Sequence, residues 1–340
     1  MTPTRYTLHC VGLLFVISGL ILPLSVATSF AQQINRLPSA SPSTGPLQCR
    51  PPYSPAQCWA LPFDTSQDFA FQGNGFAAPA VARDNINGFP AIHQPAFAND
   101  GFYGNGSSWI SAGSNSWLKV DLGRPISIET IWFGRDRAGG FDDRDPGQFT
   151  IAVAQSENVY ADGDDSNDAS EYALEFDSTA ELFDGQIYGT ETLEVRLAAP
   201  VLARFVKLTV ANYGTDIDEV QVFGAIPVSI DIKPGSASNS INVHSSGVVP
   251  VAILSSVTFD ALSVDPSTVT LAGAAVRLIG KVDKWSCSTE DVNGDGLPDL
   301  VCHVSTAELV IQPGDTSAIL EATTFSGDRI RGVDSIRVVR

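Results

Sequence analysis

The stretch SWLKVDLGRPISIETIWFGRD, residues 116–136, decides the fold of the first half of the chain. Within it Leu118, Val120 and Leu122 occupy alternate positions, which places them on one face of an extended strand. The segments ARFVKLTVANYG (203–214) and DEVQVFG (218–224) have the same period of two, and no long stretch repeats at the helical period. This pattern predicts antiparallel β-structure.

The N-terminal segment has the order of a secretory signal. Arg5 and His9 precede an apolar run, and the small residues Ser29 and Ala31 follow it. This order predicts residues 1–31 as a signal peptide that is cleaved after Ala31, which leaves no membrane-spanning segment. The alternative is an uncleaved anchor. We therefore expect a secreted protein of bacterial export.

Two composition changes divide the rest of the chain. Residues 32–48 are rich in Pro and Ser, which predicts a flexible linker. Residues 49–225 are rich in Gly, Asn, Phe and Trp, with short alternating segments, whereas residues 226–340 start new strands and turn signals. We expect two all-β domains, a sandwich followed by a smaller, sandwich-like domain.

The charge and the cysteines indicate the environment. The net charge of −18, from 38 acidic and 20 basic residues, repels phosphate backbones and argues against a nucleic-acid partner. The four cysteines outside the signal form two local pairs, Cys49 with Cys58 and Cys287 with Cys302. Disulfides in an oxidising compartment explain this even count, and four reduced thiols are the alternative.

A candidate calcium loop lies in DVNGDGLPDL, residues 291–300. Its oxygen-bearing positions follow the spacing 1, 3, 5, 7 and 9, with Gly296 at the sharp turn, and Ca²⁺ prefers such a set of six to eight oxygens. The predicted ligands are Asp291, Asn293, Asp295, Leu297 through its carbonyl, and Asp299. Because Cys302 stands where an EF-hand has its bidentate Glu, the loop is predicted to be structural. The alternative is a polar turn that caps a hairpin.

The wider C-terminal block resembles a known module. IDIKPGSASNSINVHSSGVVPVAIL, FDALSVDPSTV, DVNGDGLPDLVCHV and the final DSIRVV are similar to a module at the C-termini of many secreted bacterial proteins. This resemblance implies an exported protein with a calcium loop, and no catalytic role.

The first domain resembles the discoidin, or coagulation factor 5/8 type C, family. SWLKVDLGRPISIETIWFGRD and ARFVKLTVANYGTDIDEVQVFG carry the resemblance, which covers about residues 75–224. It implies a galactose-binding-like jelly-roll β-sandwich of the kind used by carbohydrate-binding modules, lectins and adhesion domains. It also implies a structural calcium held by Asp100, Asn105, Ser108 and Glu219. The alternative is an ordinary Asn/Gly turn with Glu219 in a salt bridge.

Ligands of this family meet loops at one end of the sandwich, which points to GRDRAGGFDDRDPG, residues 134–147. Sugars are bound by aromatic stacking and by planar hydrogen-bonding groups. The candidate ligand-binding residues are Arg135, Arg137, Phe141, Asp142, Asp143 and Arg144. The alternative is a solvated loop whose charges pair with one another. Trp109, Trp117 and Trp132 lie in patterned segments, which favours core positions over sugar platforms.

No HExxH, GxSxG or phosphate-loop motif is present, and the adjacent Asp142 and Asp143 would point apart along a strand. We therefore expect a secreted, non-enzymatic protein that binds glycans or a cell-surface or matrix component with the help of calcium. The alternatives are a structural or adhesive protein that binds another protein, and an accessory module of polysaccharide degradation.

Overall fold

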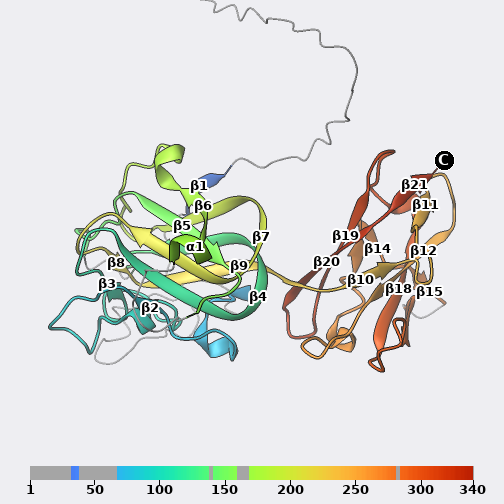
Figure 1. Ribbon diagram of the computed structural model, residues 1–340, viewed down its shortest axis with the longest axis horizontal. Helices are drawn as coiled ribbons and strands as arrows, with labels where there is room; N and C mark the ends of the chain where they lie inside the picture. Colours follow the sequence, from blue (N-terminus) through green and yellow to red (C-terminus); the bar gives the residue numbers. More distant parts are fainter. Residues whose placement is uncertain (1–31, 38–66, 138–140, 159–167, 281–283, 340) are drawn as a thin grey trace, which may run out of the picture.

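A computed structural model describes residues 32–37, 67–137, 141–158, 168–280 and 284–339. The predicted signal, most of the predicted linker, and Cys49 and Cys58 lie outside these residues. The described chain forms two lobes whose regular secondary structure is almost wholly strands (Figure 1), which confirms the predicted all-β class.

Nine strands of the described residues belong to the first domain. They are β1 (Gln33–Leu37), β2 (Val81–Ala82), β3 (Trp109–Ile110), β4 (Ser116–Gly134), β5 (Phe149–Ala154), β6 (Ala173–Asp177), β7 (Thr192–Val210), β8 (Asp216–Ile217) and β9 (Glu219–Pro227). The short helices between them are η3 (Gln72–Asn74), η4 (Pro95–Phe97), α1 (Asp168–Glu171) and η5 (Ser178–Glu181).

The two 19-residue strands β4 and β7 build both layers of a sandwich. They pair along their whole length, with breaks in register between Asp121 and Ile126 and between Ile128 and Thr130. Before the first break β4 has β2 as its second neighbour, and from Ser127 onward it has β9. One layer is therefore β2–β4–β7–β5–β6, and the other is β9–β4–β7–β1.

The core lies between these layers. The alternating Leu118, Val120 and Leu122 are buried as the sequence predicts, and so are Trp109 and Trp117. Phe149 sits among Phe133, Phe176 and Phe183 with ring centroids 4.9–5.6 Å apart. Such aromatic pairs add about 0.5–1.5 kcal/mol each beyond the area that they bury, so this cluster holds the two layers together.

Residues 33–37 were predicted as part of the flexible linker, but they form β1, an edge strand on β7. The prediction was wrong here because it averaged the composition of residues 32–48, in which Pro and Ser begin only at Pro38. Asn35 Nδ2 donates to Glu194 Oε2 over 2.7 Å, and Arg36 lies over the rings of Phe183 and Tyr188. The strand is thus fixed by side chains as well as by its backbone.

The second domain is a smaller pair of sheets. Its strands are β10 (Ile230–Ile232), β11 (Ser240–Asn242), β12 (Val248–Ile253), β13 (Thr270–Leu271), β14 (Ala274–Ala275), β15 (Leu278–Ile279), β16 (Lys284–Trp285), β17 (Cys287–Glu290), β18 (Asp299–Ser305), β19 (Ser317–Thr323), β20 (Arg329–Ser335) and β21 (Arg337–Val339), with η6 (Ala261–Ser263) and η7 (Thr306–Glu308) between them. One sheet has the order β10–β12–β18–β17, and the strands β14–β13–β19–β20 form another. The predicted Cys287–Cys302 disulfide is confirmed and joins directly opposed residues of β17 and β18.

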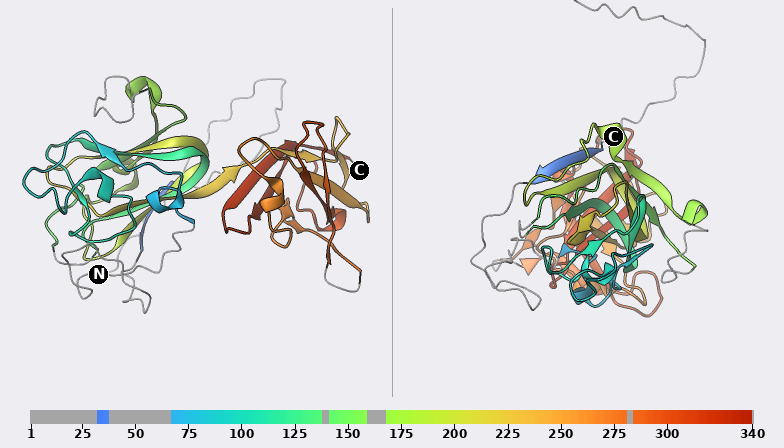
Figure 2. Two further views of the ribbon diagram at one scale, coloured as in Figure 1. Left: turned by 90° about the horizontal axis from the view of Figure 1, so that it is seen from below. Right: turned by 90° about the vertical axis from the view of Figure 1, so that its left-hand side faces the viewer.

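The domains meet where β9 ends. Ile226 and Pro227 pair in parallel with Ile330 and Arg331 of β20, so β9 crosses the boundary predicted at residues 225–226. Glu129 of the first domain accepts from Arg329 over 3.0 Å and from Arg331 over 3.3 Å. These contacts place the second domain end to end with the first (Figure 2).

Candidate functional site

The candidate site lies at the end of the sandwich farthest from the second domain, where Figure 1 places β3 and β8. Gly134, the last residue of β4, pairs with Thr192 and with Glu219, the first residues of β7 and β9. The loops before and after these residues therefore converge at one end, which we call the loop end: residues 84–115, 135–137, 141–148, 184–191 and 211–218.

A buried ion pair holds the loop end together. Arg137 Nε donates to Asp218 Oδ1 over 2.7 Å, and Asp218 Oδ2 accepts from the backbone N–H of Arg137 and of Gly104. Both side chains are fully buried, and the Arg137 guanidinium also donates to Thr192 Oγ1 and to the Glu219 carbonyl. Breaking such a pair strands a buried charge, so these residues fix the geometry of the surrounding loops.

Arg135 and Arg137, which the sequence suggests as ligand-binding residues, are instead structural. Arg137 is committed to Asp218, and Arg135 is buried with its Nη2 donating to the Ile187 carbonyl over 2.7 Å. Neither guanidinium is open to a sugar. The sequence pattern could not show this, because the partners come from segments 52 and 81 residues away.

The other four candidates remain at the surface. Phe141 is 53% exposed, and its backbone N–H donates to the buried Asp136 over 2.8 Å, while Asp142 and Asp143 are exposed. Arg144 is half-buried, and its Nη1 donates to the Gly214 carbonyl over 3.4 Å. Phe141 is therefore exposed and Arg144 half-buried, and each is held by a hydrogen bond.

Sequence reasoning missed two aromatic residues on this surface. Tyr213 is 67% exposed and precedes Gly214, the partner of Arg144, whereas Phe89 is 56% exposed and lies edge-on to His93. Arg144 lowers the pKa of His93 electrostatically, so it also lies close to this histidine. The signal that could have identified both residues is an aromatic side chain in a Gly/Asn-rich loop, where no strand pattern assigns it to the core.

A buried polar group lies beneath this surface. His93 Nδ1 is 3.0 Å from Ser108 Oγ, and burial, aided by Arg144, lowers the pKa of His93 to about 4. Asp216 is fully buried, and neither of its carboxylate oxygens makes a hydrogen bond of ordinary geometry within the described residues, although the Ser108 side chain lies near enough to act on it. Burial raises the pKa of Asp216 to about 8, and the nearby Asp218 and Asp136 act in the same direction. At neutral pH both groups are uncharged.

The predicted metal ligands of the first domain are only partly gathered. Glu219 is buried; its Oε1 accepts from the Gly101 N–H over 3.0 Å, and its Oε2 has no partner within the described residues. Burial, and then Asp100, raise the pKa of Glu219 well above its usual range, so Asp100 lies close to it. Ser107 Oγ, and not the predicted Ser108, donates to Asp100 Oδ2 over 3.1 Å. Ser108 is hydrogen-bonded to His93, and Asn105 donates its backbone N–H to Asp136.

An unpartnered buried carboxylate oxygen beside a second carboxylate fits a bound divalent cation, because a cation would offset the burial of both charges. Within the described residues no three His, Cys, Asp or Glu side chains are arranged to hold a metal by themselves. A cation there would therefore need hydroxyl, amide or carbonyl oxygens as well.

The loop at residues 291–299 is ordered by its own polar groups. Asp291 accepts from the N–H of Gly294 and of Gly296, and Asp295 accepts from the N–H of Leu297. Asp299 is buried and accepts from Ser255 N and Val292 N. Asn293 Nδ2 donates to Asp295 over 2.9 Å. Asp299 therefore joins the loop to the segment at Ser255, while the side chains of Asp291, Asn293 and Asp295 hydrogen-bond within the loop itself.

Among the described helices, none has the length and apolar character needed to cross a membrane. No protein-family model matches the sequence, and no curated protein matches it significantly.

Several solved structures are similar to the chain. The family 32 carbohydrate-binding module of Clostridium perfringens NanJ, in complex with galactose, is 15% identical and covers 44% of this chain and 94% of its own, with a TM-score of 0.33. Chitosan-binding module 2 of a chitosanase/glucanase from Paenibacillus sp. IK-5, in complex with chitotriose, is 16% identical over 46% of this chain and 100% of its own, with a TM-score of 0.33. A Streptococcus pneumoniae fucose binding module is 16% identical over 48% of this chain and 98% of its own, with a TM-score of 0.34. No ligand of this chain is inferred from these likenesses.

Proposed function

We propose that the first domain binds carbohydrate at the loop end. The observation that carries this proposal is that three loops of the loop end each expose an aromatic side chain, Phe89, Phe141 and Tyr213, and that the half-buried Arg144 donates to the carbonyl of Gly214, the residue after Tyr213. The apolar face of a sugar ring stacks on aromatic side chains, and its hydroxyls accept hydrogen bonds from a guanidinium. The exposed Asp142 and Asp143 supply acceptors for hydroxyl protons.

The support beneath this surface favours binding without a large rearrangement. Asp136 holds the backbone of Phe141, and the Gly214 carbonyl accepts from Arg144. The Arg137–Asp218 pair in turn fixes the backbone at Arg137, just after the end of β4. A site that is ordered before binding loses less conformational entropy when the ligand arrives.

We further propose calcium at two places, in each case as a structural ion. In the first domain Asp100, Ser107 and Glu219 would hold it, with Asn105 and Ser108 as the remaining predicted candidates. In the second domain Asp291, Asn293, Asp295 and the Leu297 carbonyl would hold it, beside Asp299. When bound, the ion supplies positive charge that compensates the acidic groups around it.

The setting that we propose is extracellular, with the protein acting as a non-enzymatic glycan-binding or adhesive component. The order of charged, apolar and small residues up to Ala31 supports export. The Cys287–Cys302 disulfide also supports it, because such bonds persist in oxidising compartments.

A glycan array tests the loop-end site. The full chain is applied with Ca²⁺ and with a chelator, beside Phe141→Ala and Arg144→Ala. We expect each variant to weaken binding about tenfold or more, since anchor residues of interfaces typically contribute over ~1 kcal/mol. Phe325→Ala and Arg277→Ala, on exposed residues of the second domain, are the matched controls and should bind like the wild type.

Two results would contradict this function. If the wild type binds no glycan, the carbohydrate assignment fails. If it captures an envelope protein in a manner that survives competition with free sugars, the alternative of a protein-binding adhesive module is favoured instead.

A further inference from the structure

A second polar surface lies on the outer face of the layer β9–β4–β7–β1. Gln33, Arg196 and Thr130 are direct cross-strand neighbours on β1, β7 and β4, and Phe223 of β9 follows Thr130 in the same row. Leu193, Val195 and Leu197 alternate with Glu194 and Arg196 along β7 and point into the core. The row therefore faces outward, and we call it the sheet-face site.

A second row lies beside the first. Asn35, Glu194 and Trp132 are cross-strand neighbours two residues farther along the same strands. Trp132 and Phe223 are partly exposed, with ring centroids 4.5 Å apart and planes at 53°. Two aromatic rings thus lie next to a band of amide, hydroxyl and ion-paired side chains, as in a surface that recognises a sugar.

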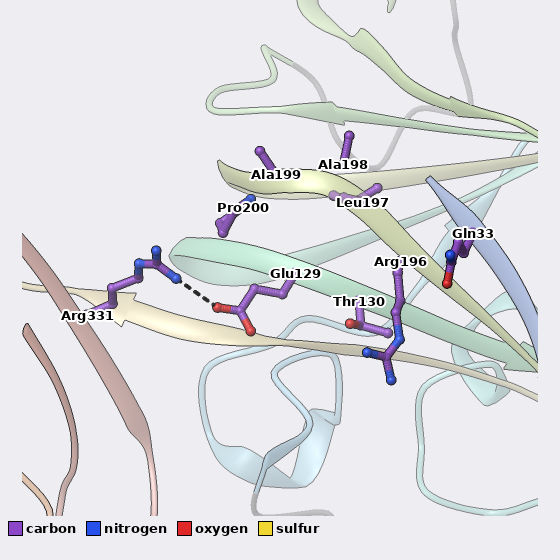
Figure 3. Close-up of a pocket in the computed structure, with 9 residues that line it drawn as sticks. All are labelled: Gln33, Glu129, Thr130, Arg196, Leu197, Ala198, Ala199, Pro200 and Arg331. Carbon is purple, nitrogen blue, oxygen red and sulfur yellow. Dashed lines mark hydrogen bonds and ion pairs between the residues drawn. The ribbon is translucent and has the colours of Figure 1, made fainter. Parts of the chain in front are cut away.

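A cavity of about 380 Å³ adjoins these rows. Gln33, Thr130 and Arg196 line one side, Pro200 at the bend of β7 lines another, and Glu129 with Arg331 closes the far side. Figure 3 shows the Arg196 side chain beside Thr130 and the Glu129–Arg331 pair across the cavity. Ligand cavities in proteins start at roughly 300 Å³, so this one can hold a small ligand. Because Arg331 belongs to β20, the second domain completes the cavity.

The charges of the cavity select the kind of ligand. Arg196 donates to both carboxylate oxygens of Glu194 over 2.9 and 3.0 Å, and Arg331 is paired with Glu129. Arg331 shares Glu129 with Arg329 and has Glu321 as a second partner at 3.7 Å, so the guanidinium groups around the cavity are matched by carboxylates and an anion gains little there. The paired groups still present donors and acceptors side by side, which matches the vicinal hydroxyls of a neutral sugar.

We propose that the sheet-face site is a second carbohydrate-binding site, which takes a neutral sugar residue of a glycan chain. It lies some four to five strand residues, roughly 15 Å, from the loop end. It uses none of the residues assigned to calcium or to the loop-end surface. One chain could therefore hold two glycans, or two parts of one glycan. Binding at one site then raises the effective concentration of the glycan at the other, so that the avidity exceeds the affinity of either site.

The test begins with a loop-end double variant, Phe141→Ala/Arg144→Ala, in the full chain. It is applied to an array of neutral oligosaccharides built from galactose, glucose or N-acetylglucosamine, with uronic-acid oligosaccharides and acidic peptides as further spots. To this variant we add Arg196→Ala, Thr130→Val or, as the matched control, Arg204→Ala. Arg204 also lies on β7 and also forms a two-bond ion pair, with Asp121, away from the cavity. Thermal melting verifies that each variant is folded.

We expect the loop-end double variant to retain binding to at least one neutral oligosaccharide. Arg196→Ala or Thr130→Val should then reduce that binding at least about tenfold, while Arg204→Ala leaves it within about twofold. Loss of all neutral binding in the loop-end variant would overturn the sheet-face site and leave the loop end standing. Residual binding that is unchanged by Arg196→Ala and Thr130→Val would also overturn the sheet-face site. So would residual binding that is confined to acidic glycans or peptides. A wild type that binds nothing would overturn both sites.

Discussion

Replacing Asp216 by Asn should stabilise the first domain relative to the wild type, and this gain in the free energy of unfolding should be larger at neutral pH than at acidic pH. Asp216 is fully buried, and burial raises its pKa from 3.8 to about 8, even though the nearby Ser108 side chain lowers it. Since the folded state keeps this proton to a higher pH than the unfolded chain does, unfolding releases a proton between these two values. The free energy of unfolding therefore falls by about 1.4 kcal/mol per pH unit across that window.

Between pH 5 and pH 7 the Asp216 proton lowers the free energy of unfolding of the wild type by about 2.7 kcal/mol, and Asp216→Asn is spared this loss. The assay is denaturant unfolding at pH 5, 6, 7 and 8, followed by the fluorescence of Trp109, Trp117 and Trp132. Other buried acids titrate in both proteins and cancel in the difference. The exposed Asp142→Asn is the control and should shift stability by less than about 0.5 kcal/mol at any pH. A difference between wild type and Asp216→Asn that stays constant with pH would refute the reasoning.

Three further predictions concern the supports of the fold. Arg137→Ala should destabilise the first domain by about 3–5 kcal/mol, measured by denaturant unfolding, because it leaves the Asp218 carboxylate buried and unpaired; a loss below 1 kcal/mol would contradict this role. Ca²⁺ should raise the melting temperature of the first domain, and Glu219→Gln should abolish that rise in calorimetry; an equal rise in the variant would exclude Glu219 as a ligand. Cys287 and Cys302 are 15 residues apart in sequence, so reducing their disulfide should lower the free energy of unfolding of the second domain by about 3 kcal/mol in the entropic model. An unfolding transition that is unchanged under reducing conditions would argue against this contribution.

Local pattern was sufficient for much of the fold. The period of two in residues 117–123, 203–214 and 218–224 predicted β-strands there but not the full length of β4 and β7, and the nearness of Cys287 to Cys302 predicted their disulfide. Both features depend on residues that are close in sequence or on one strand. The strand at residues 33–37 was missed because its stability comes from β7, about 160 residues away, and composition carries no trace of that partner.

The candidate site was less predictable, for a related reason. Arg135 and Arg137 look like solvated loop residues until Asp218 and the Ile187 carbonyl come beside them. Ser107 and Ser108 differ by one position, and in the structure only Ser107 reaches Asp100. A pattern without three-dimensional partners cannot distinguish a charge that meets a ligand from one that meets the core.

Strand β9 links the loop end to the second domain directly. It begins at Glu219, beside the proposed calcium, and ends at Pro227, paired with β20. A pull between a glycan at the loop end and the second domain would therefore run along the axis of β9. Its hydrogen bonds to β4 lie across that axis, so they would be loaded together in shear and not opened one after another. The link between the loop end and the second domain is therefore of a kind that resists extension along β9.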